Sequence, residues 1–188
     1  MQVKSKIARN LLVATALSVG FAAPSFAQDN PMVGGAPMMA DMNIVENASK
    51  APNLTTLVAA VQAAGLVETL QGDGPFTVFA PTNEAFEALP AGTVDNLLKP
   101  ENKEMLVKVL TAHVLPANAT SEAAMKMISD DGGEHNVTTV SGDALTLRMD
   151  GDKLVILDES GGTATVTTAD VMQSNGVVHV IDKVLLPK

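Results

Sequence analysis

The hydrophobic spacing along the chain limits the possible fold more than any other feature. Apolar residues recur at helical spacing in the stretches 54–64 and 101–113, whereas they alternate with polar residues in the stretches 145–149 and 163–168. Helices therefore gather in the first half of the chain and strands in the second. This order predicts an α+β domain with an antiparallel sheet rather than a repeated βαβ unit.

Capping and turn residues add local boundaries to this pattern. Asn53 offers an N-cap to the first long helix, and Gly65 offers a C-cap. After Gly74-Pro75, residues 76–80 indicate a short buried strand that Pro81 stops. The next two residues, Thr82 and Asn83, can cap a further short helix.

Turn signals also separate the later strands. Asp150-Gly151-Asp152 predicts a hairpin turn between two strands. The Asp- and Gly-rich residues 130–134 also indicate a turn, since they lack the ligand spacing of a calcium-binding EF-hand loop. His135 follows them and is expected in a solvated loop.

The N-terminal residues predict export. Lys4, Lys6 and Arg9 precede an apolar run over 11–23, and Ser25-Phe26-Ala27 then provides small residues for cleavage. Residues 1–27 are therefore expected to be a signal peptide, and the protein is expected in the periplasm or outside the cell. An uncleaved anchor is the alternative, but the run is shorter than the roughly 20 residues of a membrane span.

The residues after the signal peptide have no sustained helical or strand spacing. We expect residues 28–43 to form a flexible, Met-rich leader and residues 44–188 to form the folded domain. Thioether sulfur prefers soft ions, so the leader is a weak candidate for Cu(I) binding. The candidate ligands are Met32, Met38, Met39 and Met42. Methionines that accumulated by drift are the alternative.

The composition excludes several classes of function. The chain has no Cys, which rules out disulfides, thiolate zinc sites, iron–sulfur clusters and a cysteine nucleophile. Its formal net charge of −9 and its five Phe with no Tyr or Trp argue against nucleic acid as a partner. No GxSxG, HExxH, phosphate-loop or GxGxxG motif is present, so we expect neither catalysis nor a cofactor.

Two longer motifs carry a resemblance to a known family. The stretch 74–86, GPFTVFAPTNEAF, resembles the first signature of the fasciclin (FAS1) domain, and the stretch 174–187, SNGVVHVIDKVLLP, resembles the second. Between them, residues 110–116, LTAHVLP, are similar to the segment that often contains a Tyr-His pair in this family. The resemblance spans residues 44–187, and we expect the small single-domain type that occurs as secreted or periplasmic bacterial proteins.

The resemblance implies a wedge of two β-sheets with helices packed along one side, in an extracellular or envelope adhesion module. Ala112 replaces the tyrosine of the Tyr-His pair, so an adhesive role of that tyrosine does not carry over to this chain. The family's Asp-centred integrin-type motif has its counterpart at Asp170, followed by Val171 and Met172. These three residues are the candidate partner-binding site, and the alternative for Asp170 is a turn or helix-capping aspartate.

The histidines inside the motifs allow two interpretations. His113 and His179 could act in acid–base chemistry or bind a metal. We favour buried structural histidines, each with one hydrogen-bond donor and one acceptor partner. The remaining motif positions are expected to be structural as well, namely Pro81, Thr82, Asn83, Asn175, Gly176 and Asp182.

The leading functional hypothesis is a non-catalytic, exported interaction or adhesion module that binds an envelope protein, an extracellular protein or a matrix component. One alternative is a carrier of a small apolar ligand between sheet and helices, with Leu106, Val109 and Met149 in the cavity wall. Copper binding by the leader is the other. The sequence leaves the oligomeric state open.

Overall fold

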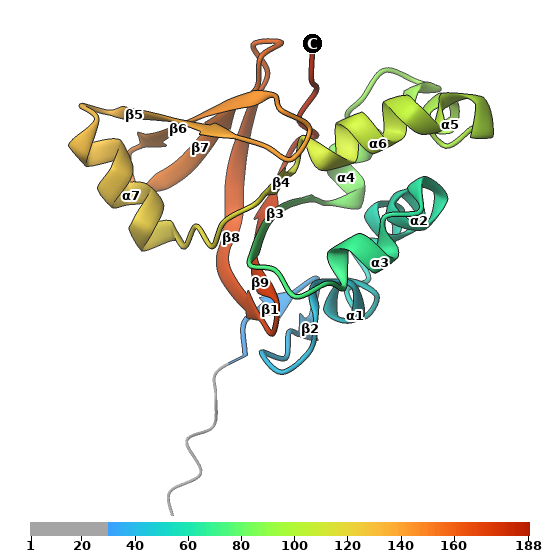
Figure 1. Cartoon of the computed structure of the whole chain (residues 1–188), viewed down its shortest axis with the longest axis horizontal. Coiled ribbons are helices and arrows are strands. Elements are labelled where there is room, and N and C mark those ends of the chain that lie inside the picture. The colour runs from blue at the N-terminus through green and yellow to red at the C-terminus, as the bar shows by residue number, and fades with distance from the viewer. Residues whose placement is uncertain (1–29) are drawn as a thin grey trace, which may run out of the picture.

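Residues 30–188 are described by the computed structural model, and helices precede most of the strands along the chain (Figure 1). The predicted signal peptide, residues 1–27, lies outside the described residues. The helices are α1 (Ile44–Ala48), α2 (Thr55–Ala64), α3 (Val67–Leu70), α4 (Asn83–Glu87), α5 (Thr93–Leu97), α6 (Lys103–Thr111) and α7 (Ser121–Asp130), with a 3₁₀ turn at Pro100–Asn102. The strands are β1 (Met32–Val33), β2 (Ala36–Pro37), β3 (Phe76–Pro81), β4 (Val114–Leu115), β5 (Glu134–Thr138), β6 (Ala144–Asp150), β7 (Lys153–Leu157), β8 (Thr163–Gln173) and β9 (Gly176–Ile181).

The predicted α+β fold is confirmed, with seven strands in one hydrogen-bonded order, β4-β3-β9-β8-β7-β6-β5. The sheet has two arms, one formed by β5, β6 and β7 and the other by β9, β3 and β4. Strand β8 belongs to both arms, because its first residues pair with β7 and its later residues pair with β9. The prediction of a purely antiparallel sheet is wrong at one pair. Strands β3 and β9 run parallel, with Phe76 opposite Gly176, because the last strand returns beside the first buried one.

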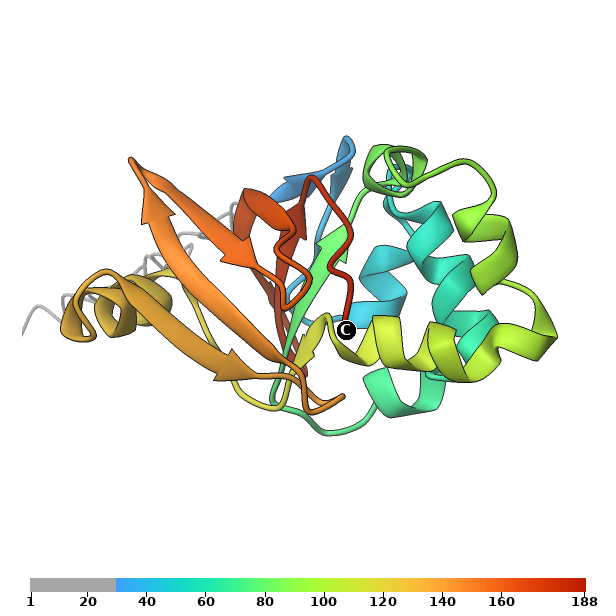
Figure 2. The same cartoon turned by 90° about the horizontal axis from the view of Figure 1, so that it is seen from above.

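Two hydrophobic cores lie on opposite faces of the central strands. Val78 and Ala80 of β3 pack into the core beneath helices α1 to α6, whereas Phe79 of the same strand packs into a second core beneath α7. Figure 2 shows these helices gathered on one side, with the β5–β7 arm and α7 on the other. Burial on both faces explains why β3 and β9 are runs of apolar residues without alternation.

Helix capping follows the sequence in part. Thr82 caps α4 as predicted, with its Oγ1 accepting the Ala85 N–H at 3.3 Å, and Gly65 ends α2 with φ +75°. The predicted cap of α2 by Asn53 is wrong. The Oδ1 of Asn83 instead accepts the Thr56 N–H at 3.0 Å. A residue of α4 thus caps α2, and local spacing does not reveal a contact between such distant residues.

The segment expected to be a flexible leader differs from the prediction in its described part. Strands β1 and β2 form a hairpin, and Val33 and Met38 are buried in the core beneath the helices. The side chain of Asn47 accepts the Met39 N–H at 2.9 Å and donates to the Met39 carbonyl at 2.7 Å. Tertiary contacts therefore hold this segment, whose residues have no regular spacing of their own.

Helix α7 has only a weak signature in the sequence. Thr120 caps it by accepting the Ala123 N–H at 3.3 Å, and Ala124 and Ile128 are its buried residues. Two buried positions four residues apart are too few to distinguish a helix from a loop.

Among residues 30–188, no helix combines the length and apolar character that a membrane span requires.

Candidate functional site

Asp170 lies in an irregular stretch of the pairing between β8 and β9. The register with β9 is irregular between Thr168 and Val171, and Asp170 has φ +54°, in the left-handed region. Its Oδ1 accepts the Ser121 N–H at 2.7 Å, and the Ser121 hydroxyl donates to Oδ2. The carboxylate therefore holds the first turn of α7, as the capping interpretation suggested, while the helix that it caps comes from a distant part of the chain.

The other two residues of the predicted partner site have opposite environments. Val171 is buried in the core beneath the helices. Met172 exposes 42% of its surface, on the next position of β8. The predicted triplet thus offers a half-buried carboxylate and an exposed apolar side chain, but Val171 is inaccessible to a partner.

Both motif histidines use both ring nitrogens. His179 donates from Nε2 to the Ala119 carbonyl at 2.7 Å and accepts the Asp170 N–H on Nδ1 at 3.3 Å. His113 donates from Nδ1 to the Val109 carbonyl at 2.7 Å and accepts the Leu185 N–H on Nε2 at 2.9 Å. Each ring therefore has the donor and acceptor partners that a structural histidine needs.

Burial decides the charge of these rings. It lowers the pKa of His113 to about 4, because removal from water outweighs the opposing effects of the Val109 carbonyl and the Asp158 carboxylate. Burial also lowers the pKa of His179, against smaller effects of the Ala119 carbonyl and Asp170. Both rings are neutral at pH 7.

Asn175 and Gly176 join three elements. The Nδ2 of Asn175 donates to the Leu70 carbonyl at 2.7 Å, and its Oδ1 accepts the Ile44 N–H at 3.1 Å. A Cβ on Gly176 would come within 2.0 Å of the Phe76 carbonyl oxygen, so no larger residue fits beside β3. These contacts account for the Asn-Gly pair without a ligand.

Two further motif residues sit at strand ends. Asp182 follows β9, and its Oδ1 accepts the Thr165 N–H of β8 at 2.7 Å. Pro81 ends β3 opposite Ile181 of β9.

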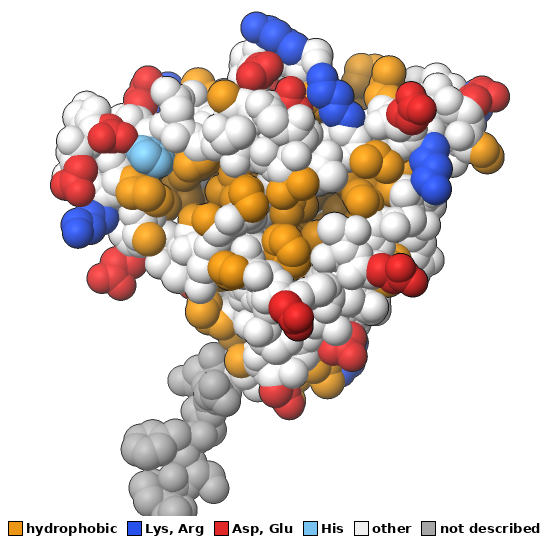
Figure 3. All heavy atoms as spheres, in the orientation of Figure 1, with side chains coloured by type: hydrophobic (Ala, Val, Ile, Leu, Met, Phe, Trp, Pro, Cys, Tyr) orange, Lys and Arg blue, Asp and Glu red, His pale blue; other side chains and the backbone are white. Residues whose placement is uncertain are grey.

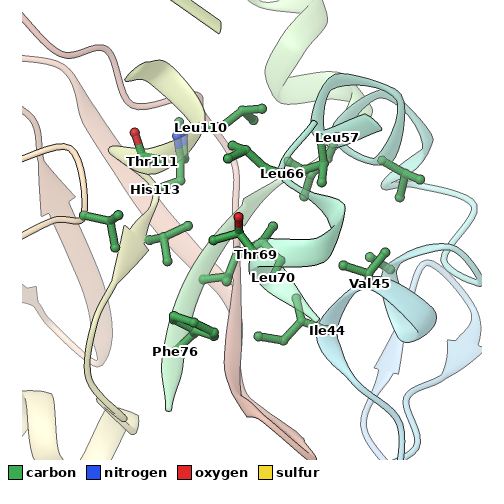
Figure 4. A pocket seen from close by; sticks show the side chains of 16 residues that line it. Ile44, Val45, Leu57, Leu66, Thr69, Leu70, Phe76, Leu110, Thr111 and His113 are labelled. Atoms are coloured by element: carbon green, nitrogen blue, oxygen red, sulfur yellow. The ribbon is translucent and has the colours of Figure 1, made fainter. Parts of the chain in front are cut away.

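An apolar cavity of about 60 Å³ lies between α1, α2, α3, β3 and the end of α6 (Figure 4). Its walls are mostly aliphatic, and they comprise Ile44, Val45, Ala48, Leu57, Val58, Val61, Leu66, Thr69, Leu70, Phe76, Val78, Leu110, Thr111, His113, Val114 and Val140. The expected lining was wrong. Leu106 and Val109 pack elsewhere in the same core, and Met149 lies against the second core.

The candidate copper ligands do not form a shared set of free sulfurs. Met38 is buried in the core, whereas Met32 exposes 56% of its surface. The Met42 sulfur lies 2.8 Å from Lys50 Nζ, and the Met39 sulfur lies 3.3 Å from Asn30 Nδ2. Within the described part of the chain, no three His, Asp or Glu side chains gather where a metal ion could bind.

His135 does not lie in a loop. It belongs to β5, and its Nδ1 lies 2.5 Å from the Asp131 carboxylate.

Sequence reasoning also missed Ser121, the partner of Asp170. The sequence signal for this contact is weak: Thr120 and Ser121 precede the apolar residues Ala124 and Ile128, and nothing near them points to Asp170.

The sequence of this chain is similar to a known domain family and to individual members of it. A family model for the fasciclin domain matches residues 52–187. Protein sll1483 of Synechocystis sp. is 47% identical over 170 residues, which cover 90% of this chain and 87% of that protein. Transforming growth factor-beta-induced protein ig-h3 of Sus scrofa is 38% identical over 132 residues, which cover 70% of this chain and 17% of that protein.

A solved structure shares the fold. It contains a FAS1 domain pair from the insect cell adhesion molecule fasciclin I, and the TM-score is 0.67 at 20% identity. The matched part covers 77% of this chain and 51% of that chain. None of these three proteins carries the name of an enzyme.

Proposed function

Because the chain belongs to the fasciclin domain family, we propose that it is an exported, non-catalytic module that binds a protein or matrix component at the cell surface or in the envelope. The domain in ig-h3 occupies a small part of that protein, as expected for a module. The relationship to a domain of an insect cell adhesion molecule supports a role in adhesion. The apolar stretch 11–23 near the N-terminus supports export.

The observation that carries the proposal is that β8 presents a held carboxylate, Asp170, and an exposed apolar side chain, Met172, only two residues apart. Asp170 is held by Ser121, so its carboxylate keeps one position. Met172 extends to solvent two residues later and offers apolar area for burial by a partner. We propose that this part of β8, with Asp170 as its positioned acid, contacts the partner. The net charge of −9 favours a partner with a basic surface.

The test compares two exposed methionines. Met172→Asp is expected to reduce retention of native envelope or matrix material on the immobilised protein at least tenfold, because a new charge would be buried at the contact. Met105→Asp, on α6 with 60% exposure, is the matched control and should retain wild-type binding. Equal retention by the wild type and Met172→Asp, with both variants folded by circular dichroism, would contradict the proposed surface.

A further inference from the structure

The cavity beneath the helices offers few free hydrogen-bonding groups to a polar ligand. The two ring nitrogens of His113 are occupied, and the Thr111 hydroxyl donates to the Val107 carbonyl at 2.6 Å. No charged side chain lines the walls. Water inside would find almost no hydrogen-bond partners, and such apolar cavities accept apolar guests instead.

The cavity has a mouth on the molecular surface. Leu57, Leu70 and Leu110 form its buried interior, whereas Thr69 and Val140 are exposed. Figure 4 shows the side chains of Leu66 and Thr69 near each other in the cavity wall. Figure 3 shows apolar side chains gathered around a hollow in the middle of this face, over the region of β4, α3 and α6. A guest that fills the interior can therefore extend outward along apolar surface.

The size of the cavity sets the size of the group that enters. One water molecule needs roughly 10–15 Å³ measured in this way, so 60 Å³ holds about five groups of that size. This corresponds to the last few carbons of a chain and is too small for a sterol or a folded lipid.

We propose that the cavity binds the methyl end of a single linear alkyl chain, as in a free fatty acid or fatty alcohol, with the polar end in solvent beyond Thr69 and Val140. The polar residues in the cavity walls are Thr69, Thr111 and His113. None of them is charged at pH 7, so the walls offer no charged partner to a head group. The site is separate from the proposed partner surface, since Met172 does not line it.

Chain length provides the sharpest test. Titration of the purified protein with n-alcohols from butanol to decanol, followed by the methyl NMR signals of Leu and Val, should show affinity that rises about fourfold per methylene up to about hexanol. Longer chains should gain less than twofold per methylene, because the added carbons stay outside. Hexanoate and hexanol should bind within about twofold of each other. A constant increase through decanol would indicate surface adsorption and overturn the proposal.

Two variants locate the site. Val140→Asp places a charge at the mouth and should weaken hexanol binding at least tenfold, and Leu66→Phe, which narrows the cavity, should do the same. Val140 and Met172 have similar exposure, 45% and 42%, so Met172→Asp is the matched control and should bind hexanol like the wild type. Unchanged hexanol binding in both folded cavity variants would overturn the site.

Phosphatidylcholine vesicles distinguish free chains from membrane lipids. The methyl ends of membrane lipids lie in the middle of the bilayer, so the protein should not sediment with vesicles. Binding to vesicles without binding to free alcohols would contradict the proposal. Because Val140→Asp should leave partner retention intact, failure of the alkyl site and failure of the proposed function would be seen separately.

Discussion

At the scale of single residues, the two buried histidines act as neutral connectors. His113 links the end of α6 to Leu185 in the C-terminal segment, and His179 links β9 to the carbonyl of Ala119 and to the bulge at Asp170. Each link uses one protonated and one unprotonated ring nitrogen. Protonation of a ring would turn its acceptor nitrogen into a donor that faces an N–H group.

This arrangement predicts acid sensitivity. The pKa of His113 is about 4 in the folded protein and about 6.5 in an unfolded chain, so between these values the unfolded state binds more protons. Stability should therefore be complete above pH 6.5 and should fall as the pH decreases to 4, by about 3 kcal/mol from His113.

Urea unfolding at pH 7.5 and pH 5 measures this effect. His113→Gln keeps a donor and an acceptor but cannot take up a proton, so it should lose less stability between the two pH values than the wild type. Its stability at pH 7.5 should be lower, because the amide fills the site less well. An identical pH dependence in the variant and the wild type would exclude His113 as a source of the acid sensitivity.

At the scale of elements, the β1–β2 hairpin belongs to the folded core. Met38 packs beneath the helices, Asn47 binds both backbone groups of Met39, and the Met42 carbonyl accepts the Ser174 N–H at 2.9 Å. The segment therefore connects α1 with the β8–β9 turn. Because Met38 supplies apolar volume to the core, its role is packing.

A pair of methionine variants measures the contribution of the hairpin. Met38→Ala should lower the free energy of unfolding by about 2–4 kcal/mol, because it leaves a cavity in the core. Met32→Ala, in the same hairpin but exposed, should change it by less than about 0.5 kcal/mol. Urea titration of the two variants gives both values. If both substitutions changed the free energy of unfolding by equally small amounts, residues 30–43 would be a flexible leader and not part of the folded core.

At the scale of the whole molecule, β3 and β9 lie between two cores. Val178 and Val180 face the helices, and Ile181 faces the core beneath α7. Strand β8 then carries the sheet from one arm of the wedge to the other. The shared strands couple the two arms, so a loss of packing in one core removes support from the other.

This coupling predicts one cooperative unfolding transition. Ile156→Ala in the second core should lower the melting midpoint of the helices, read by circular dichroism at 222 nm, about as much as Leu57→Ala in the first core. Each change removes a buried side chain and should cost about 2–5 kcal/mol. Helices that melt at the wild-type midpoint in Ile156→Ala, while the β5–β7 amides exchange rapidly, would show two independent units.

The sequence by itself determined the elements whose causes are local. The α+β class, the strand that ends at Pro81, the cap at Thr82 and the helix end at Gly65 follow from side-chain spacing and backbone preference within a few residues. The family motifs likewise singled out His113, His179 and Asn175, and the rule that a buried ring needs two partners predicted that each histidine would have a donor and an acceptor partner. These features depend on neighbours along the chain, which a sequence displays directly.

Only the tertiary structure decided the contacts between distant segments. Asn83 caps α2, Asp170 holds α7 through Ser121, and Met38 completes a core formed mainly by residues from later segments. The apolar cavity is likewise assembled from α1, α2, α3, β3 and α6. In each case the interaction energy depends on two or more segments whose relative position is set by burial, so no single stretch of the sequence contains the signal.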